Sequence, residues 1–165
     1  MRRSASIAAI SIIAAGIIAF GSGCSSKPAD FTVTSAKPDL TLVDTGAKGP
    51  SIGDYEVFSS AVTKDGKPFG VLYGMKLEVA LPPVPGAPEG LGRFQNQLTF
   101  DLPDGTICVA GVQYYTMDGS IPQTLKEGEL RAIVGGTGAY AGARGTLRTT
   151  QHLDGTRTQE LTFLP

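Results

Sequence analysis

The stretch from residue 135 to residue 145 constrains this chain most, because five of its eleven residues are glycine. Glycine is the residue that reaches positive φ and close backbone approach without a steric penalty. Short stretches rich in β-forming residues flank it at 130–134 and 146–152. The sequence therefore predicts a tight corner between two strands, with a short helical turn at 139–141.

Two phosphate-binding motifs are candidates for these glycines. A P-loop ends in Gly-Lys-Ser/Thr, whereas residues 142–144 read Gly-Ala-Arg, so that motif is excluded. Residues 136–141 match the Gly-x-Gly-x-x-Ala fingerprint of dinucleotide-binding folds. That fingerprint opens a βαβ unit, however, and too little chain follows residue 145 to complete one. We therefore expect no nucleotide and no other cofactor.

Residues 132–145, with the sequence AIVGGTGAYAGARG, resemble the glycine signature of the dirigent proteins and the allene oxide cyclase barrel superfamily. Supporting pieces lie upstream in the expected order: Gly53-Asp54, Gly70 with Gly74, residues 100–107, and Gly111. The resemblance covers roughly residues 39–165 and implies a barrel of eight antiparallel strands around a cavity. It makes the following residues a structural corner, with the tyrosine as a plug and the arginine as a tie: Gly135, Gly136, Gly138, Tyr140, Gly142, Arg144 and Gly145.

The rest of the chain reads as a succession of short strands without any sustained helical period. Tight-turn signals and a proline-rich loop at 81–92 separate the strands. The expected strands are 31–35, 40–43, 55–61, 69–80, 94–101, 106–116, 130–134, 146–152 and 157–164. This spacing predicts an all-β antiparallel barrel or sandwich, and the resemblance selects the eight-stranded antiparallel β-barrel.

The first 24 residues have the pattern of an export signal. Arg2 and Arg3 precede an apolar run at 7–20, which is shorter than a membrane span, and small residues lead to Cys24. A cysteine in this position resembles a bacterial lipobox, although Gly21 stands where an aliphatic residue is usual. We expect a signal peptide at 1–23, lipidation (palmitate) of Cys24, a tether with a short strand at 24–38, and a barrel domain at 39–165. The domain would then lie on the extracytoplasmic face of the cell membrane.

Composition excludes several function classes. The formal net charge is −1 and there is no basic stripe, so we expect no nucleic-acid partner. The sequence has a single histidine, His152, and one cysteine besides Cys24, which is too few for a cluster of His and Cys ligands, so we expect no metal site. The sequence favours a buried, inert thiol for Cys108 over a catalytic pair with His152.

The long strand at 69–80 has two different faces. Alternation and the family resemblance disagree about which of them points into the barrel. Its odd positions are all apolar, whereas its even positions include Gly70, Gly74, Lys76 and Glu78. Alternation by itself assigns the odd face to the core. In the allene oxide cyclases, the residue two after the second glycine points into the barrel, and here that residue is Lys76. Both assignments stay open from sequence, since alternation does not say which side of a barrel is wet.

The resemblance and the strand patterns supply the candidate site residues. Asp44 follows the first strand, where the family carries a carboxylate, and is also a plain turn residue. Asn96 shares the parity of an apolar face and is either a pocket amide or a satisfied core amide. With Lys76, these two form the candidate catalytic set, and Glu78 and Tyr115 are candidate ligand-binding residues.

Members of the superfamily cyclise apolar substrates, steer phenoxy-radical coupling or bind ligands. We therefore expect a lipoprotein barrel that binds an apolar, aromatic or phenolic small molecule and templates a cyclisation or isomerisation. The alternative is a non-catalytic cell-envelope module that binds protein partners through its outer surface. The apolar outer face that the family assignment would leave on the long strand also predicts a homo-oligomer.

Overall fold

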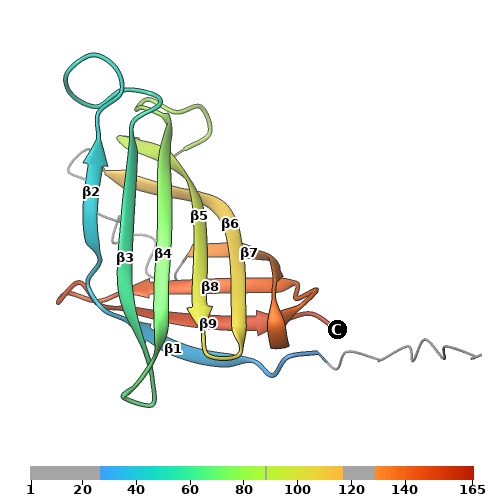
Figure 1. Ribbon diagram of the computed structural model, residues 1–165. Helices are drawn as coiled ribbons and strands as arrows, with labels where there is room; N and C mark the ends of the chain where they lie inside the picture. Colours follow the sequence, from blue (N-terminus) through green and yellow to red (C-terminus); the bar gives the residue numbers. More distant parts are fainter. Residues whose placement is uncertain (1–26, 88, 117–128) are drawn as a thin grey trace, which may run out of the picture.

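The computed structural model describes residues 27–87, 89–116 and 129–165 (Figure 1). Nine strands and one short 3-10 helix account for most of this part of the chain. They are β1 (Phe31–Ser35), β2 (Asp39–Val43), β3 (Tyr55–Lys64), β4 (Lys67–Ala80), β5 (Leu91–Leu102), β6 (Gly105–Thr116), β7 (Glu129–Gly136), η2 (Gly138–Tyr140), β8 (Gly145–Gln151) and β9 (Arg157–Phe163).

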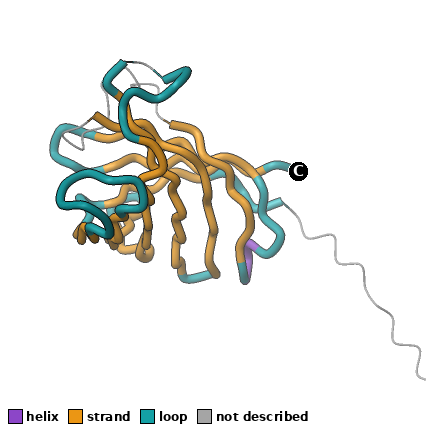
Figure 2. Tube along the Cα trace, turned by 90° about the horizontal axis from the view of Figure 1, so that it is seen from above, coloured by secondary structure: helices purple, strands orange, loops and turns teal. Residues whose placement is uncertain are grey.

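The strands form one antiparallel sheet that closes on itself. Their order is β1-β9-β8-β7-β6-β5-β4-β3-β2, and β1 also pairs with β3 through Thr34 and Thr63. Because β1 and β2 pair with different halves of β3, together they fill one strand position. The result is a closed eight-stranded barrel, and Figure 2 shows its strands from above. The predicted fold class is confirmed.

The strand boundaries agree closely with the expected ones, including β1 at the expected 31–35. What differs is where the barrel begins. β1 lies before residue 39, where the barrel domain was expected to begin. It pairs along its whole length with β9, from Phe31 opposite Leu161 to Ser35 opposite Arg157. The strand pairing of the barrel therefore already begins at Phe31.

The two ends of the barrel are built differently. The loops 44–54 and 81–90 and the turn 152–156 lie at one end, which we call the mouth. The two-residue turns 65–66 and 103–104 and the glycine corner 137–144 lie at the other, which we call the closed end. The two long loops 44–54 and 81–90 therefore lie at the mouth, whereas two tight turns and the folded glycine corner close the other end.

The glycine corner folds over the closed end. Gly138 has φ of 59°, and a Cβ there would collide with the Asp104 carbonyl, so only glycine fits. This geometry turns Tyr140 inward, where its ring is 7% exposed and lies 6.2 Å from the ring of Phe163. Arg144 donates from Nη1 to the Ala143 carbonyl at 2.8 Å.

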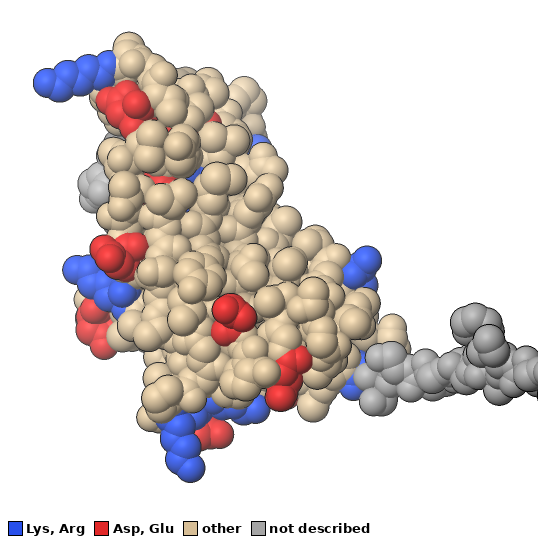
Figure 3. Space-filling view, in the orientation of Figure 1, with Lys and Arg blue, Asp and Glu red and all other residues tan. Residues whose placement is uncertain are grey.

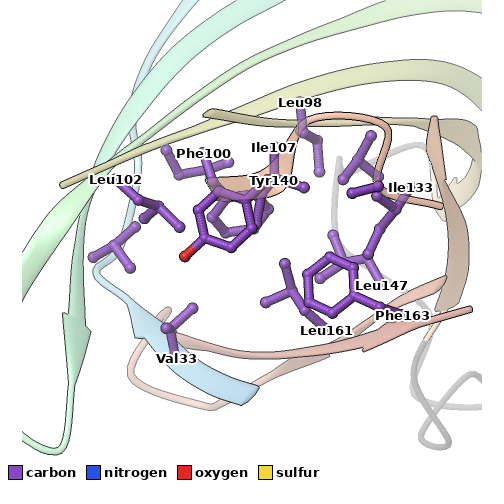
Figure 4. Packing of buried hydrophobic residues seen from close by; sticks show 14 residues of the cluster. Val33, Leu98, Phe100, Leu102, Ile107, Ile133, Tyr140, Leu147, Leu161 and Phe163 are labelled. Carbon is purple, nitrogen blue, oxygen red and sulfur yellow. The ribbon is translucent and has the colours of Figure 1, made fainter. Parts of the chain in front are cut away.

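Apolar side chains fill the closed half of the barrel (Figure 4). Tyr140 and Ala143 reach into this cluster from the corner, and the other members come from the inner faces of the strands. The cluster contains Val33, Val62, Leu72, Leu98, Phe100, Leu102, Ile107, Val109, Ile133, Tyr140, Ala143, Leu147, Leu161 and Phe163. Burial of this many large side chains is the main stabilising contribution of the fold.

The structure decides the orientation of β4. Leu72 is 1% exposed and Glu78 4%, whereas Tyr73 is 49% exposed. The even positions, Lys76 among them, therefore face the interior, as the family resemblance implies, and the apolar odd face is outside. Binary patterning alone gave the wrong face here, because this barrel places charged groups inside its mouth half.

The expected signal peptide, Cys24 and the loop at 117–128 lie outside the described residues. Within the described ranges, no helix is long and hydrophobic enough to span a bilayer.

Candidate functional site

Polar side chains occupy the inner surface of the barrel toward the mouth. They come from every strand position and lie above the apolar cluster of the closed half. We call them the polar cluster: Ser35, Glu56, Lys76, Glu78, Asn96, Gln113, Glu129, Arg131, Thr149, Arg157 and Gln159.

Two ion pairs anchor the polar cluster. Lys76 Nζ lies 2.8 Å from Glu56 Oε2, and both side chains are largely shielded from solvent. Arg131 Nη2 lies 3.1 Å from Glu129 Oε2, and the Arg131 side chain is buried. The ammonium of Lys76 also lies 5.6 Å from the ring centroid of Phe94, within cation–π range.

A chain of hydrogen bonds crosses the barrel from the second ion pair. Arg131 Nη1 donates to Thr149 Oγ1 at 2.8 Å, and Thr149 Oγ1 donates to Gln159 Oε1 at 2.6 Å. Gln159 Nε2 then donates to Ser35 Oγ at 3.2 Å. The chain links β7, β8, β9 and β1, so it fixes the side chains on that wall of the barrel.

Burial disfavours the charged forms of Lys76 and Glu129, although each has an ion-pair partner. Desolvation lowers the pKa of Lys76 and outweighs the opposing attraction of Glu56. Desolvation likewise raises the pKa of Glu129, against the attraction of Arg131. The interior of the mouth half is therefore a dry environment in which a ligand's polar groups would interact strongly.

Four buried polar atoms in this region have no hydrogen-bond partner: Asn96 Nδ2, Arg131 Nε, Glu78 Oε1 and Tyr115 Oη. An unpaired buried polar atom costs about 1–3 kcal/mol, so native proteins keep few of them. Four inside one half of a small barrel leave hydrogen-bonding capacity there for a bound molecule, whether water or a ligand.

A small cavity lies in the middle of the barrel between the polar cluster and the apolar cluster. Its volume open to the centres of water-sized spheres is about 20 Å³, room for a water molecule rather than for a ring. Lys76, Asn96 and Arg131 line it, together with Phe58 and Leu72. An organic ligand therefore has to sit nearer the mouth, with only its polar end directed toward this cavity.

The inner rim of the mouth is apolar and partly exposed. Leu40 and Leu42 of β2 pair with Phe58 and Glu56 of β3, so their side chains share the inner face. They are nevertheless 41% and 64% exposed. Across the mouth, the rings of Phe94 and Tyr115 stack with centroids 4.2 Å apart. The mouth therefore offers apolar and aromatic contacts above the polar cluster.

The structure brings together four of the five candidate site residues. Lys76, Asn96, Glu78 and Tyr115 all lie on the inner face of the mouth half. Asp44 lies apart from them, exposed in the loop 44–54, where its Oδ2 accepts a hydrogen bond from the Gly49 amide at 3.3 Å. Asp44 therefore acts as a turn residue in this structure.

Sequence reasoning missed Glu56, Glu129, Arg131 and Arg157. Arg131 was hard to find because both of its neighbours in sequence are apolar, so alternation assigns the charged residue to the outside. The same reasoning gave the wrong face for β4. Only the cross-strand register, which a single sequence does not give, shows that Arg131 lies over Gly111, where there is room for a long side chain.

The remaining reactive residues do not join the site. Cys108 lies on the outer face of β6, opposite Thr99 of β5, and is half-buried. His152 bonds to Thr158 at 2.8 Å across the β8–β9 turn. Among the described residues, no three His, Cys, Asp or Glu side chains come together in a way that could hold a metal ion.

No protein-family model matches the sequence, and no curated protein matches it. Solved structures do. Pyocyanin demethylase is similar over 82% of this chain and all of that chain, with 25% identity and a TM-score of 0.66.

Two cyclase structures share the fold at lower identity. One is described as a nonspecific heme-binding cyclase that catalyses a 4 + 2 cycloaddition during neoabyssomicin biosynthesis. It is 12% identical with a TM-score of 0.57, over 85% of this chain and 66% of that chain. The other is the Diels–Alderase AbmU from Streptomyces koyangensis, 17% identical with a TM-score of 0.53, over 86% and 72% of the two chains. The chain thus has the fold of small barrels that act on small molecules.

Proposed function

We propose that this protein is a small-molecule-binding barrel of the allene oxide cyclase and dirigent type. An apolar or aromatic ligand enters at the mouth, packs against Leu42, Phe94 and Tyr115, and directs its polar end toward the polar cluster. Any turnover is a cyclisation or isomerisation in which the barrel holds the substrate in a reactive conformation. Such positioning can supply roughly 7–11 kcal/mol of a barrier when the geometry is right.

The observation that carries this proposal is the unequal filling of the barrel. The closed half is packed by large apolar side chains, whereas the mouth half keeps four unpaired buried polar atoms beneath a partly exposed apolar rim. Ligand sites in proteins have this composition, with mostly apolar walls and a few converging polar groups.

The similar structures support the class of ligand. One carries the name of a demethylase of pyocyanin and the others are cyclases, so this barrel fold accommodates small-molecule substrates of different chemistries. Fold likeness alone does not choose a reaction, and the proposal for this chain rests on its own inner residues.

A thermal-shift screen of residues 27–165 against apolar, aromatic and phenolic compounds, with pyocyanin among them, tests the proposal. We expect at least one class to raise the melting temperature, and Lys76→Met or Asn96→Ala to weaken the hit. Thr41→Ala, on the outer face of β2 opposite Val57, is the control. The absence of any hit in the panel would contradict the proposal.

A specific observation favours a second role, protein interaction through the outer surface. Tyr73 and Val57 are 49% and 40% exposed, and the surface over β3, β4 and β5 is mostly free of charged side chains (Figure 3). We propose that a second copy of this chain covers this face. Light scattering at increasing concentration, with Tyr73→Lys as the comparison, tests it; a monomer at every concentration would contradict it.

We also propose that the chain is an exported lipoprotein, with Cys24 as the lipidated residue. The described end of the tether supports an orientation, because Asp30 Oδ1 accepts a hydrogen bond from the Phe163 amide at 2.8 Å. The tether therefore meets the barrel at its closed end, which would leave the mouth directed away from the membrane. Membrane fractionation of the wild type and Cys24→Ala tests this; equal release into the soluble fraction would contradict lipidation.

A further inference from the structure

Glu78 and Tyr115 form an unusual pair on the inner face near the mouth. Glu78 is 4% exposed and Tyr115 5%, and neither Glu78 Oε1 nor the Tyr115 hydroxyl has a hydrogen-bond partner. The two groups lie close enough for a weak mutual hydrogen bond to contribute to both of their pKa shifts, but their oxygens do not reach the distance and angle of a full hydrogen bond. Each oxygen therefore keeps hydrogen-bonding capacity for a third group.

The surrounding backbone holds this pair in place. The end of β4 is fixed to the loop 44–54 on both sides of Glu78, because its amide donates to the Asp54 carbonyl at 2.7 Å and its carbonyl accepts from the Gly53 amide at 2.9 Å. The ring of Tyr115 lies directly over Gly92, where a Cβ would collide with it. Contacts within the protein therefore hold the backbone of Glu78 and the ring of Tyr115 in place.

The charges around Glu78 favour its neutral form. Desolvation raises the pKa of Glu78, and the nearby Asp54 and Glu56 carboxylates raise it further, while Tyr115 opposes them. Lys76, two residues away on the same face of β4, is paired with Glu56 instead. A neutral carboxylic acid has an O–H group to donate, as does the Tyr115 hydroxyl, whose own pKa burial raises.

We infer that Glu78 and Tyr115 together bind an acceptor oxygen, namely the carbonyl oxygen of a conjugated or aromatic ketone, through two O–H donors. This inference rests on the proposed ligand-binding function and names the ligand class. The stacked rings of Phe94 and Tyr115 contact the conjugated system, and the two donors hold its oxygen. Neutral donors in a dry site also stabilise the negative charge that develops on such an oxygen during enolisation.

A matched pair of ligands tests the inference. The compounds 9-fluorenone and fluorene have the same ring skeleton and differ in one carbonyl oxygen. Equilibrium dialysis with residues 27–165 should give at least a tenfold preference for fluorenone. Tyr115→Phe, which removes only the unpaired hydroxyl, should reduce this preference three- to tenfold without lowering the melting temperature.

The pH dependence separates the role of Glu78 from a purely structural one. Fluorenone affinity in the wild type should fall as the pH rises through the raised pKa of Glu78, because a carboxylate repels the carbonyl oxygen. Glu78→Gln keeps an N–H donor and cannot ionise, so its affinity should stay level over the same range. A wild-type affinity that does not change with pH would overturn the assigned donor role of Glu78.

The outcomes distinguish this inference from the proposed function. Equal affinity for fluorenone and fluorene would overturn the carbonyl site but leave an apolar ligand-binding barrel in place. Binding of neither compound, together with an empty thermal-shift screen, would overturn both. A carbonyl preference that survives Tyr115→Phe unchanged would place the oxygen elsewhere and overturn the inference.

Discussion

The closed half and the mouth half of this barrel are made by the same strands but obey different rules. On β5, Phe100 belongs to the closed half and is completely buried among apolar neighbours, whereas Asn96, four residues earlier on the same face, is 1% exposed and has an unpaired Nδ2. The closed half is packed for stability. The mouth half gives up part of that stability for polar groups that a ligand can use.

The largest expected effect is in the closed half. Phe100→Ala removes a fully buried ring and leaves a cavity, so the free energy of unfolding should fall by about 3–5 kcal/mol. Urea denaturation followed by circular dichroism measures it. A loss below about 1 kcal/mol would mean that this end of the barrel is not the stabilising core.

The buried ion pair of the mouth half should give the next largest effect. Arg131→Met leaves Glu129 buried without its cation, which should cost about 3 kcal/mol. The double variant Arg131→Met/Glu129→Leu removes both charges and should recover most of that loss. If the double variant is as unstable as the single one, the pair contributes to the fold beyond its charge balance.

Glu78 provides a pH-dependent comparison. Its pKa is raised in the folded protein, so above the ordinary carboxyl pKa of 4.5 the unfolded chain binds fewer protons than the folded one. Stability should therefore be highest below that pKa and fall as the pH rises toward the raised value, by about 1.4 kcal/mol for each unit of pKa difference. Urea titrations of wild type and Glu78→Gln at pH 4 and pH 7 should show the variant gaining relative stability only at pH 7.

The smallest expected effect sharpens the contrast with Phe100. Asn96→Leu replaces an amide with an unpaired nitrogen by an apolar side chain of similar volume, so the free energy of unfolding should change by no more than about 1 kcal/mol. The same variant should weaken ligand binding in the thermal-shift assay. A large loss of stability with unchanged binding would show that Asn96 is a structural core amide after all.

Many residues of the candidate site could be predicted from the sequence, but the side chains that pair with them could not. Lys76 was found through the family resemblance and Glu78 through its shared parity with Lys76 on that strand. Asn96 was found because it interrupts an apolar face, and Tyr115 because two adjacent tyrosines lie on opposite faces of the sheet. The Glu56 partner of Lys76 lies 20 residues away and meets it only through the β3–β4 register. Such pairings depend on strand register, which a single sequence does not specify.

The sequence by itself determined the strands, the turns between them and the glycine corner, since these follow from local backbone preferences of glycine, proline and β-branched residues. The tertiary structure alone decided which face of β4 is inside, because alternation shows that two faces differ but not which one a closed sheet encloses. It also decided that Asp44 stays in its loop while the Tyr115 side chain lies beside Glu78. Those contacts join residues far apart in the chain, and only closure of the barrel brings them together.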